Sequence, residues 1–272
     1  MTASSSGKVS KALNLVMSEE LMRSRTSPRQ TLFCGMVILS LFALSCAVEK
    51  SDTNLEATRS MQTGNQSASS DRAGAIQYVG LGDSTGFGVG AREGGYVIRL
   101  FRRIEQRLPG SRLSNFCVSG ATSADILGGQ LDPAIKSNPD LVTIGIGIND
   151  IGRNVDLNSF ATNYETILKR LKNETSARIV ISNIPDISTS TRVPESLRSQ
   201  SQQLIIQYNN RLESIAASHG VVLFDVFSLT REELPRHREY FSEDGFHPSD
   251  LGYELWANKM WPTVARTVGV SE

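Results

Sequence analysis

From residue 75 onward, the chain alternates between short apolar runs and stretches in which apolar residues recur at helical spacing. Five short runs, rich in aliphatic and β-branched residues, are typical of buried strands. They cover residues 76–81, 113–118, 141–146, 178–182 and 221–226. The helical spacing predicts helices over residues 96–108, 160–171 and 197–215, and a last helix over residues 251–264 that Ser249 caps.

This alternation of strands and helices predicts an α/β fold. Short, buried strands separated by helices form a mostly parallel sheet, here of five strands, with helices on both faces. In such sheets, ligands bind beyond the carboxyl ends of the strands. We therefore expect the functional residues to follow directly after strand ends.

Upstream of this domain, the pattern indicates a targeting segment. An apolar run over residues 32–44 follows Arg23, Arg25 and Arg29, is short for a bilayer span and ends at small residues. The sequence that closes it, Ala-Leu-Ser-Cys ending at Cys46, resembles a bacterial lipoprotein signal, in which the cysteine becomes the lipidated first residue. An ordinary secretory signal and a retained anchor are the alternatives.

Residues 46–74 are dominated by small polar and charged side chains and contain few large apolar ones. Such a segment buries too little surface to offset the entropy of ordering it, so it predicts a flexible tether. The chain thus divides into a targeting segment (1–45), a tether (46–74) and a folded domain (75–272). We expect an exported protein, anchored on the periplasmic or outer surface if Cys46 is lipidated and secreted otherwise.

Composition removes several classes of function. The 272-residue chain has a formal net charge of zero, which does not indicate a nucleic-acid partner. Of its three cysteines, Cys34, Cys46 and Cys117, only the last lies in the predicted domain, so a disulfide framework is excluded. The spacings typical of zinc and calcium ligands do not occur, and the sequence predicts neither a metal nor a cofactor.

Residues suited to acyl transfer follow three of the strands and precede the last helix. A Gly-Asp-Ser motif ends at Ser84, Gly120 follows the second strand, Asn149 follows the third, and an Asp-x-x-His motif joins Asp244 to His247. An aspartate three residues before a histidine can orient the imidazole, which can accept the serine proton and return it. The N–H groups of Ser84 and Gly120 and the amide of Asn149 can stabilise an oxyanion.

These four blocks, in this order, resemble the SGNH/GDSL hydrolase family over about residues 77–261, and most closely its lysophospholipase/thioesterase-like branch of small esterases. The resemblance implies a three-layer α/β/α sandwich of the flavodoxin-like kind. It also implies a triad of Ser84 as nucleophile, His247 as base and Asp244 as the third member. Ser84, Gly120 and Asn149 are then the oxyanion donors.

Neighbouring polar residues have structural interpretations. Asp83 and Asp150 are predicted to hold their loops through hydrogen bonds. Cys117 is predicted to be a small buried side chain, with a reactive thiol as the alternative.

Two further histidines compete for the role of base. His219 is predicted at a helix end and His237 in a solvated loop, and neither follows a carboxylate at the spacing that His247 has. Phe87, Val89 and Tyr96 are candidates either for an acyl pocket or for the core.

The sequence therefore predicts a serine esterase that works on a small acyl ester through an acyl-enzyme. It leaves open whether the substrate is a lysophospholipid, a thioester, an acylated envelope glycan or a small exogenous ester. The alternative from another class is a substrate-binding lipoprotein that keeps the fold without turnover. The complete set of Ser84, Asn149, Asp244 and His247 favours the enzyme.

Overall fold

The computed structural model describes residues 74–272; the predicted targeting segment, the tether up to residue 73 and Cys46 lie outside the described residues. Within residues 74–272, five strands form one sheet in the order β2-β1-β3-β4-β5, and every neighbouring pair is parallel. This is the flavodoxin-like strand order of doubly wound folds. The strands are β1 (Gln77–Gly82), β2 (Arg112–Asn115), β3 (Leu141–Gly145), β4 (Arg178–Ser182) and β5 (Val222–Phe224).

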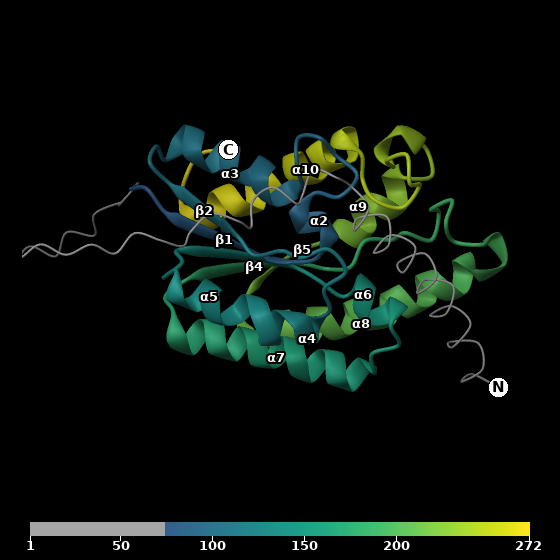
Figure 1. Ribbon diagram of the computed structural model, residues 1–272, viewed down its shortest axis with the longest axis horizontal. Helices are drawn as coiled ribbons and strands as arrows, with labels where there is room; N and C mark the ends of the chain where they lie inside the picture. The colour runs from purple at the N-terminus through teal and green to yellow at the C-terminus, as the bar shows by residue number, and fades with distance from the viewer. Residues whose placement is uncertain (1–73) are drawn as a thin grey trace, which may run out of the picture. The chain divides into compact units, whose positions relative to one another are not determined.

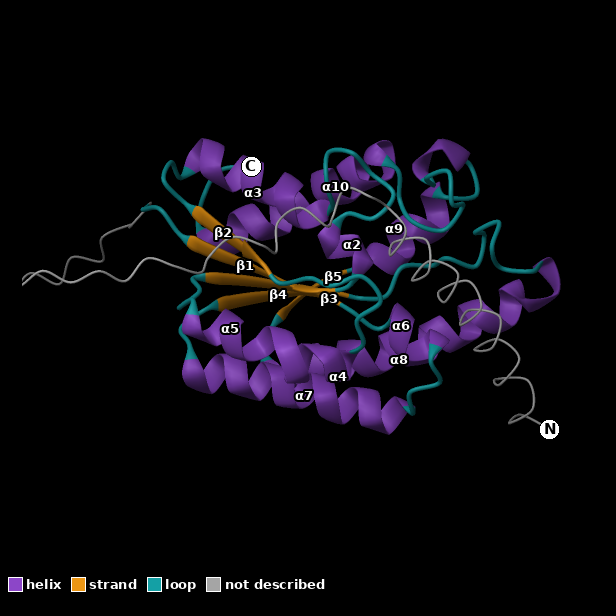
Figure 2. Cartoon of the chain, in the orientation of Figure 1, coloured by secondary structure: helices purple, strands orange, loops and turns teal. Residues whose placement is uncertain are grey.

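Helices cover both faces of this sheet, so the predicted three-layer sandwich is confirmed (Figure 1). One layer contains α2 (Ser84–Phe87), α3 (Tyr96–Arg107), α9 (Val226–Glu233) and α10 (Asp250–Val268). The other contains α4 (Ser123–Asp125), the π-helix η1 (Ile126–Gln130), α5 (Leu131–Lys136), α6 (Ile148–Gly152), α7 (Leu157–Glu174) and α8 (Arg198–His219). Figure 2 shows the strands between these two layers, and the short 3-10 helices η2 (Glu195–Leu197) and η3 (Arg238–Tyr240) lie in connecting loops.

The two faces of the sheet bury different cores. Under α7 and α8 the core is mainly aliphatic and includes Ile144, Leu168 and Leu212. Under α3 and α10 it is richer in aromatic rings, where Tyr96 and Trp256 stack with centroids 5.0 Å apart. Both cores consist of fully buried side chains, which supply the main stabilising term of the fold.

Two strands are shorter than predicted, for identifiable reasons. β2 ends at Asn115, whose side chain turns back to accept from the N–H of Cys117, although Phe116 and Val118 still donate to β1 carbonyls. β5 ends at Phe224 because Asp225 caps α9 by accepting from the N–H of Ser228. The other strands and the four long helices lie where predicted, and the Ser249 cap is confirmed.

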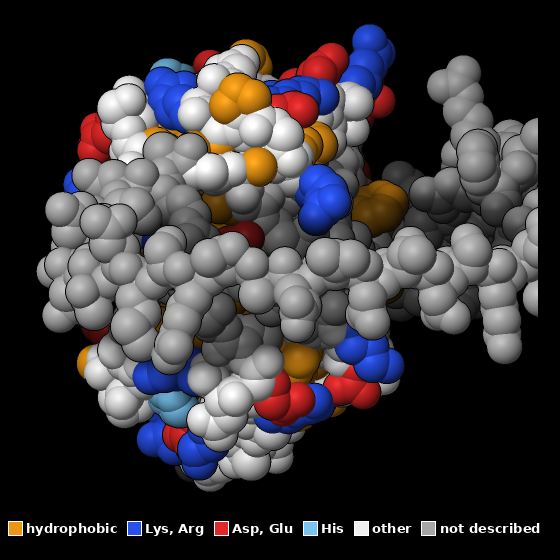
Figure 3. Space-filling view, turned by 90° about the vertical axis from the view of Figure 1, so that its left-hand side faces the viewer, with side chains coloured by type: hydrophobic (Ala, Val, Ile, Leu, Met, Phe, Trp, Pro, Cys, Tyr) orange, Lys and Arg blue, Asp and Glu red, His pale blue; other side chains and the backbone are white. Residues whose placement is uncertain are grey.

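The part of the surface that Figure 3 shows in colour carries side chains of both charges. On the side shown in Figure 3, basic and acidic side chains of the described residues are interspersed and form no extended basic patch. Within residues 74–272, none of the helices combines the length and the hydrophobicity that crossing a bilayer requires.

Candidate active site

Ser84 lies in a tight turn where β1 passes into α2. Asp83 caps this short helix, and its Oδ1 accepts from the N–H of Thr85 at 2.9 Å and from its hydroxyl at 2.8 Å. Gly82 precedes them with φ +149°, and a Cβ there would lie 2.2 Å from the carbonyl oxygen of Gly145 on β3. Only glycine allows β1 and β3 to approach this closely at the point where the Ser84 turn begins.

Gln130, which the sequence did not indicate as a site residue, holds the same turn although it lies 48 residues from Gly82 in the chain. Gln130 is buried, and its amide oxygen accepts from the N–H of Gly82 at 2.9 Å while its amide nitrogen donates to the carbonyl of Gly82 at 2.8 Å. Gly82 pairs with Gly145 of β3 on one side, and Gln130 supplements the Val118 N–H on the other side, where β2 has already ended. Gln130 is the last residue of the π-helix η1, a kind of helix that often occurs at functional sites.

The second half of the site is a turn that leads into α10. Asp244 Oδ1 accepts from the backbone N–H groups of Phe246 and His247 at 2.7 and 2.9 Å, and from the hydroxyl of Ser242 at 2.8 Å. Its Oδ2 lies 2.7 Å from Nδ1 of His247. One carboxylate therefore fixes both the backbone of the turn and the imidazole that the turn carries.

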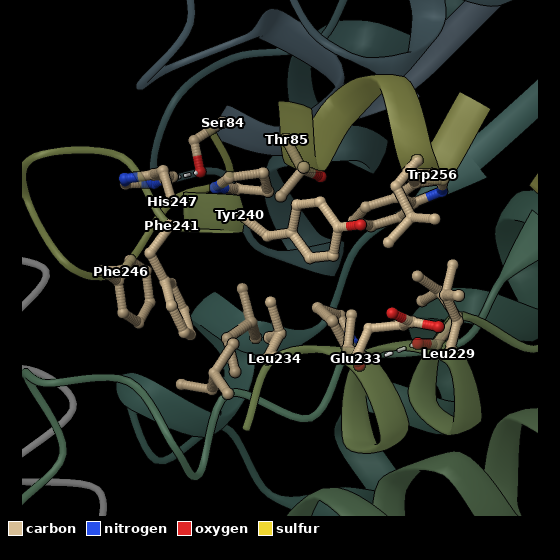
Figure 4. Close-up of a pocket in the computed structure, with 18 residues that line it drawn as sticks. Ser84, Thr85, Leu229, Glu233, Leu234, Tyr240, Phe241, Phe246, His247 and Trp256 are labelled. Atoms are coloured by element: carbon tan, nitrogen blue, oxygen red, sulfur yellow. Dashed lines mark hydrogen bonds between the residues drawn. The ribbon is translucent and has the colours of Figure 1, made fainter. Parts of the chain in front are cut away.

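The two halves meet at a hydrogen bond between side chains. His247 Nε2 lies 3.0 Å from Ser84 Oγ, as Figure 4 shows, and both residues are almost completely buried. An ionised Asp244 can only accept, so Nδ1 carries a proton and Nε2 is free to accept from the hydroxyl. The predicted Ser84, His247 and Asp244 thus form a continuous chain of hydrogen bonds, the arrangement from which a serine can be deprotonated.

The charge of Asp244 is favoured by its surroundings. Partial burial by itself raises the pKa of this carboxyl, but the hydrogen bond and charge of the His247 ring and the two backbone N–H groups outweigh it. The net effect holds the pKa of Asp244 well below its usual value. The carboxylate therefore stays ionised beside an imidazole that gains a proton.

The predicted oxyanion donors lie in the adjoining loops. Asn149 follows β3 and is the second residue of α6; its Nδ2 donates to the carbonyl of Ala121 at 2.8 Å and lies 3.5 Å from Oδ2 of Asp83. Gly120 has φ +78°, and its carbonyl accepts from the guanidinium of Arg153 at 2.6 Å. Asn149 is therefore tied to the residue next to Ser84, whereas Gly120 lines a neighbouring hollow together with Arg153.

The two buried aspartates near Ser84 hold loops, as expected. Asp150 accepts from the N–H of Ser123 at 3.0 Å and from its hydroxyl at 2.6 Å, and burial raises the pKa of Asp150 to about 6. Burial also raises the pKa of Asp83, against the opposing effect of the hydrogen bonds from Thr85. Cys117 is buried, its pKa is raised well above the usual value by burial, and it forms no disulfide among the described residues. These conditions disfavour the thiolate that a reactive cysteine needs.

The competing histidines lie away from Ser84. His219 is the last residue of α8, and His237 lies 3.0 Å from a carboxylate oxygen of Glu239 on a loop. Within residues 74–272, no group of three or more His, Cys, Asp or Glu side chains is arranged to hold a metal ion.

A cavity opens beside Ser84 and His247, and the sequence did not indicate its walls. Its volume is about 50 Å³. Phe87, Val89 and Tyr96 do not line it: Phe87 is half exposed and Tyr96 is in the core. The apolar lining comes instead from the loop between β4 and α8, from α6, from α9, from the segment between α9 and α10, and from α10. It includes Ile148, Ile187, Leu229, Leu234, Phe246 and Trp256. A helix over residues 226–233 would have been the signal, but it is only eight residues long and its first residue falls in the strand predicted over residues 221–226.

Comparison with known proteins gives one family and one fold. Residues 81–255, more than half of the chain, match the family described as GDSL-like Lipase/Acylhydrolase. The chain is 26% identical over 211 residues to the spore germination lipase LipC of Bacillus licheniformis, covering 68% of the chain and 94% of that protein. It is 27% identical over 169 residues to an acetylxylan esterase of Geobacillus stearothermophilus, covering 60% of the chain and 75% of that protein. A solved structure of an acetylxylan esterase from the same organism has a TM-score of 0.58 at 21% identity, over 74% of this chain and 97% of that one.

Proposed function

The chain belongs to the GDSL-like lipase/acylhydrolase family, and on that basis we propose that it is a serine esterase whose triad is Ser84, His247 and Asp244. It is a hydrolase of carboxylic esters. The observation that carries the triad is the pair of contacts His247 Nε2–Ser84 Oγ (3.0 Å) and His247 Nδ1–Asp244 Oδ2 (2.7 Å). In solved catalytic mutants of the Geobacillus esterase, one serine, one histidine and one aspartate three positions before that histidine are replaced, a spacing that Asp244 and His247 share.

In the proposed first step, the Ser84 hydroxyl attacks the ester carbonyl and its proton passes to His247 Nε2. A bond forms between Oγ and the acyl carbon, and the carbonyl oxygen becomes negative. When the tetrahedral intermediate collapses, the bond to the leaving alcohol breaks and the alcohol takes the proton from Nε2. Asp244 stabilises the imidazolium between these two transfers, which its lowered pKa favours.

Water completes the cycle by the same route. It gives a proton to His247 and attacks the acyl carbon; the carboxylic acid leaves, and Ser84 regains its proton. We assign the oxyanion to the N–H groups of Ser84 and Gly120 and to the Asn149 amide. The contact of that amide with Asp83 is long, at 3.5 Å, so one N–H can turn to a better acceptor when one is present.

The test is the Ser84→Ala enzyme assayed with p-nitrophenyl acetate and butanoate. Losing the nucleophile should lower kcat/KM by on the order of 10⁴-fold or more. Ser214→Ala, at an exposed serine of α8, is the matched control and should hydrolyse both esters at the wild-type rate. A Ser84→Ala enzyme that keeps most of its activity would contradict the triad.

The same serine separates the enzyme from a binding protein. A fluorophosphonate probe should label the folded wild-type protein and not Ser84→Ala, because only an activated serine reacts with it. If the wild-type protein is not labelled, a substrate-binding role without turnover is favoured.

We also propose that the protein is exported and held at a membrane through a lipidated Cys46. The support is the sequence pattern alone: basic residues, a short apolar run, and a cysteine at its end. Cys46→Ser should move the protein from the membrane fraction to the soluble fraction, because the acyl chains supply the attachment. A variant that stays membrane-bound would rule out this anchor.

A further inference from the structure

The cavity beside the nucleophile is lined almost entirely by apolar surface. Ile148, Ile187 and Leu234 are buried in its walls, and Phe246 packs edge-on against the His247 ring with centroids 5.0 Å apart. Ser84 and His247 lie at one side of it in Figure 4, while Leu229 and Trp256 lie at the far side. The reacting atoms of the proposed reaction are therefore at the edge of an apolar compartment.

The two threonines of the lining have their hydroxyl groups bonded elsewhere. The Thr85 hydroxyl donates to Asp83, and the Thr230 hydroxyl accepts from the N–H of Asp186 and donates within α9. Glu233 is partly exposed and lies 3.8 Å from Nε2 of His237, outside the catalytic turn. The buried Nε1–H of Trp256 has no hydrogen-bond partner among the described residues. A sugar or a charged headgroup in the cavity would exchange its many hydrogen bonds with water for very few, which is costly.

The order of the chemical steps decides which half of the ester occupies the cavity. His247 Nε2 must hand its proton to the departing alcohol and then take one from the incoming water, so alcohol and water use the same side. That side must be open to solvent and tolerate polar groups. The apolar cavity offers neither property, so we place the departing alcohol and the water outside it, on the solvent side of Ser84 and His247. The polar hollow lined by Ser119, Gly120 and Arg153 does not include either of these two residues in its lining.

From this geometry, and resting on the proposed function, we infer that the cavity between α9 and α10 binds the hydrocarbon acyl group of the substrate. Its small volume, about 50 Å³, favours a short chain. Each methylene that enters such a cavity should raise kcat/KM about fourfold until the cavity is full. Specificity is thus set by the length of the acyl chain.

Leu229 provides the test, since it stands at the far side of the cavity and is only half buried. The measurement is kcat/KM for p-nitrophenyl acetate, butanoate, hexanoate, octanoate and decanoate. For the wild type, kcat/KM should rise from acetate through butanoate and fall by decanoate. Leu229→Trp should lower the ratio of hexanoate to acetate at least tenfold, and Leu229→Ala should move the maximum to a longer chain.

Leu251→Ala is the matched control, because Leu251 lies on α10, is 57% exposed and does not line the cavity. It should leave the chain-length profile unchanged. A profile that the two Leu229 variants do not move, in proteins with wild-type circular dichroism, would overturn the inference. So would a change in preference among acetates of different alcohols instead of among acyl chains.

The two levels of proposal fail separately. If Ser84→Ala keeps its activity, the proposed function is wrong. If Ser84→Ala is inactive while the Leu229 variants keep the wild-type profile, only the acyl assignment is wrong.

Discussion

The turn that carries the proposed nucleophile, Ser84, and the turn that carries the proposed base, His247, are built in different ways. The Ser84 turn is held by residues far away in the chain, namely Gln130 and Gly145. The Asp244–His247 turn is held mainly by its own aspartate, which binds two backbone N–H groups and the imidazole within three residues. One turn depends on the assembled sheet, whereas the other is largely self-contained.

The carboxylates of the two turns also differ in electrostatics. Asp83 and Asp150, on the nucleophile side, are buried, and burial raises the pKa of each of them. Asp244, on the base side, is paired with His247, and its pKa is lowered. The ionised forms of the buried acids near Ser84 therefore destabilise the folded state. The ionised form of Asp244 is instead stabilised by its partners, and the proposed reaction needs this negative charge.

The strongest way to break the base turn is Asp244→Asn. An asparagine can still accept from the backbone N–H groups, but its amide presents donors to Nδ1 and imposes the wrong tautomer on His247. We expect kcat to fall on the order of 10⁴-fold with little change in the melting temperature. A fall of less than tenfold, measured with p-nitrophenyl butanoate, would contradict the proposed role of Asp244.

Gln130→Met tests the nucleophile turn. It keeps the volume of the side chain but removes the acceptor of the buried Gly82 N–H, while the Gly82 carbonyl keeps the N–H of Val118 as a donor. A buried donor that loses its acceptor costs about 1–3 kcal/mol, so we expect the free energy of unfolding to fall by that amount. We also expect kcat to fall at least tenfold with a smaller change in KM, since Ser84 is displaced and the acyl cavity is not.

The exposed Gln207 of α8 gives the control for this substitution. Gln207→Met should leave both the free energy of unfolding and kcat unchanged. If Gln130→Met lowers stability but leaves kcat intact, Gln130 stabilises the fold without positioning the nucleophile.

Asp150→Asn tests the electrostatic difference between the two turns. Because the pKa of Asp150 rises from 3.8 to about 6 on folding, its contribution to stability is fully present below about pH 4 and is lost as the pH rises through 6. The free energy of unfolding of the wild type, relative to Asp150→Asn, should therefore fall by about 3 kcal/mol over this range. Urea unfolding at several pH values measures it, and a difference independent of pH would contradict the raised pKa.

The smallest effect is expected from Ser190→Ala. The buried Ser190 hydroxyl donates to the carbonyl of Gly245 inside the base turn at 2.6 Å. Since Asp244 already holds this turn, losing the bond should cost about 1 kcal/mol of stability and less than tenfold in kcat/KM. A loss in kcat/KM as large as that of Gln130→Met would mean that the base turn also depends on distant contacts.

The contrast between the turns explains which parts were predictable. The pairing of Asp244 with His247 could be predicted because the two residues lie three positions apart. Ser84 could be predicted because a glycine and an aspartate directly before it indicate a tight turn. Gln130 gave no signal because its partner lies 48 residues away and because the glycines before it obscure the helical pattern. The long, periodic helices and the buried strands were predicted well for the same reason that the base turn was: the information is local.

The cavity was missed for a related reason. Its walls come from five separate segments, and a residue such as Leu229 has the same appearance in the sequence whether it faces a core or a substrate. Only the assembled layers determine which of these apolar side chains remain without a neighbour on one side. Specificity is thus a property of tertiary packing, whereas the type of chemistry follows from short motifs.

Ser84 and His247 are 163 residues apart in the chain: Ser84 follows the first strand of the sheet, and His247 lies just before α10. During synthesis, Ser84 therefore leaves the ribosome long before His247 does. A nascent chain that has already folded its early strands holds a serine without an acceptor for its proton, and it cannot turn over an ester. In a refolding experiment, catalysis would appear only when α10 docks, so enzyme activity itself would report the last step of folding.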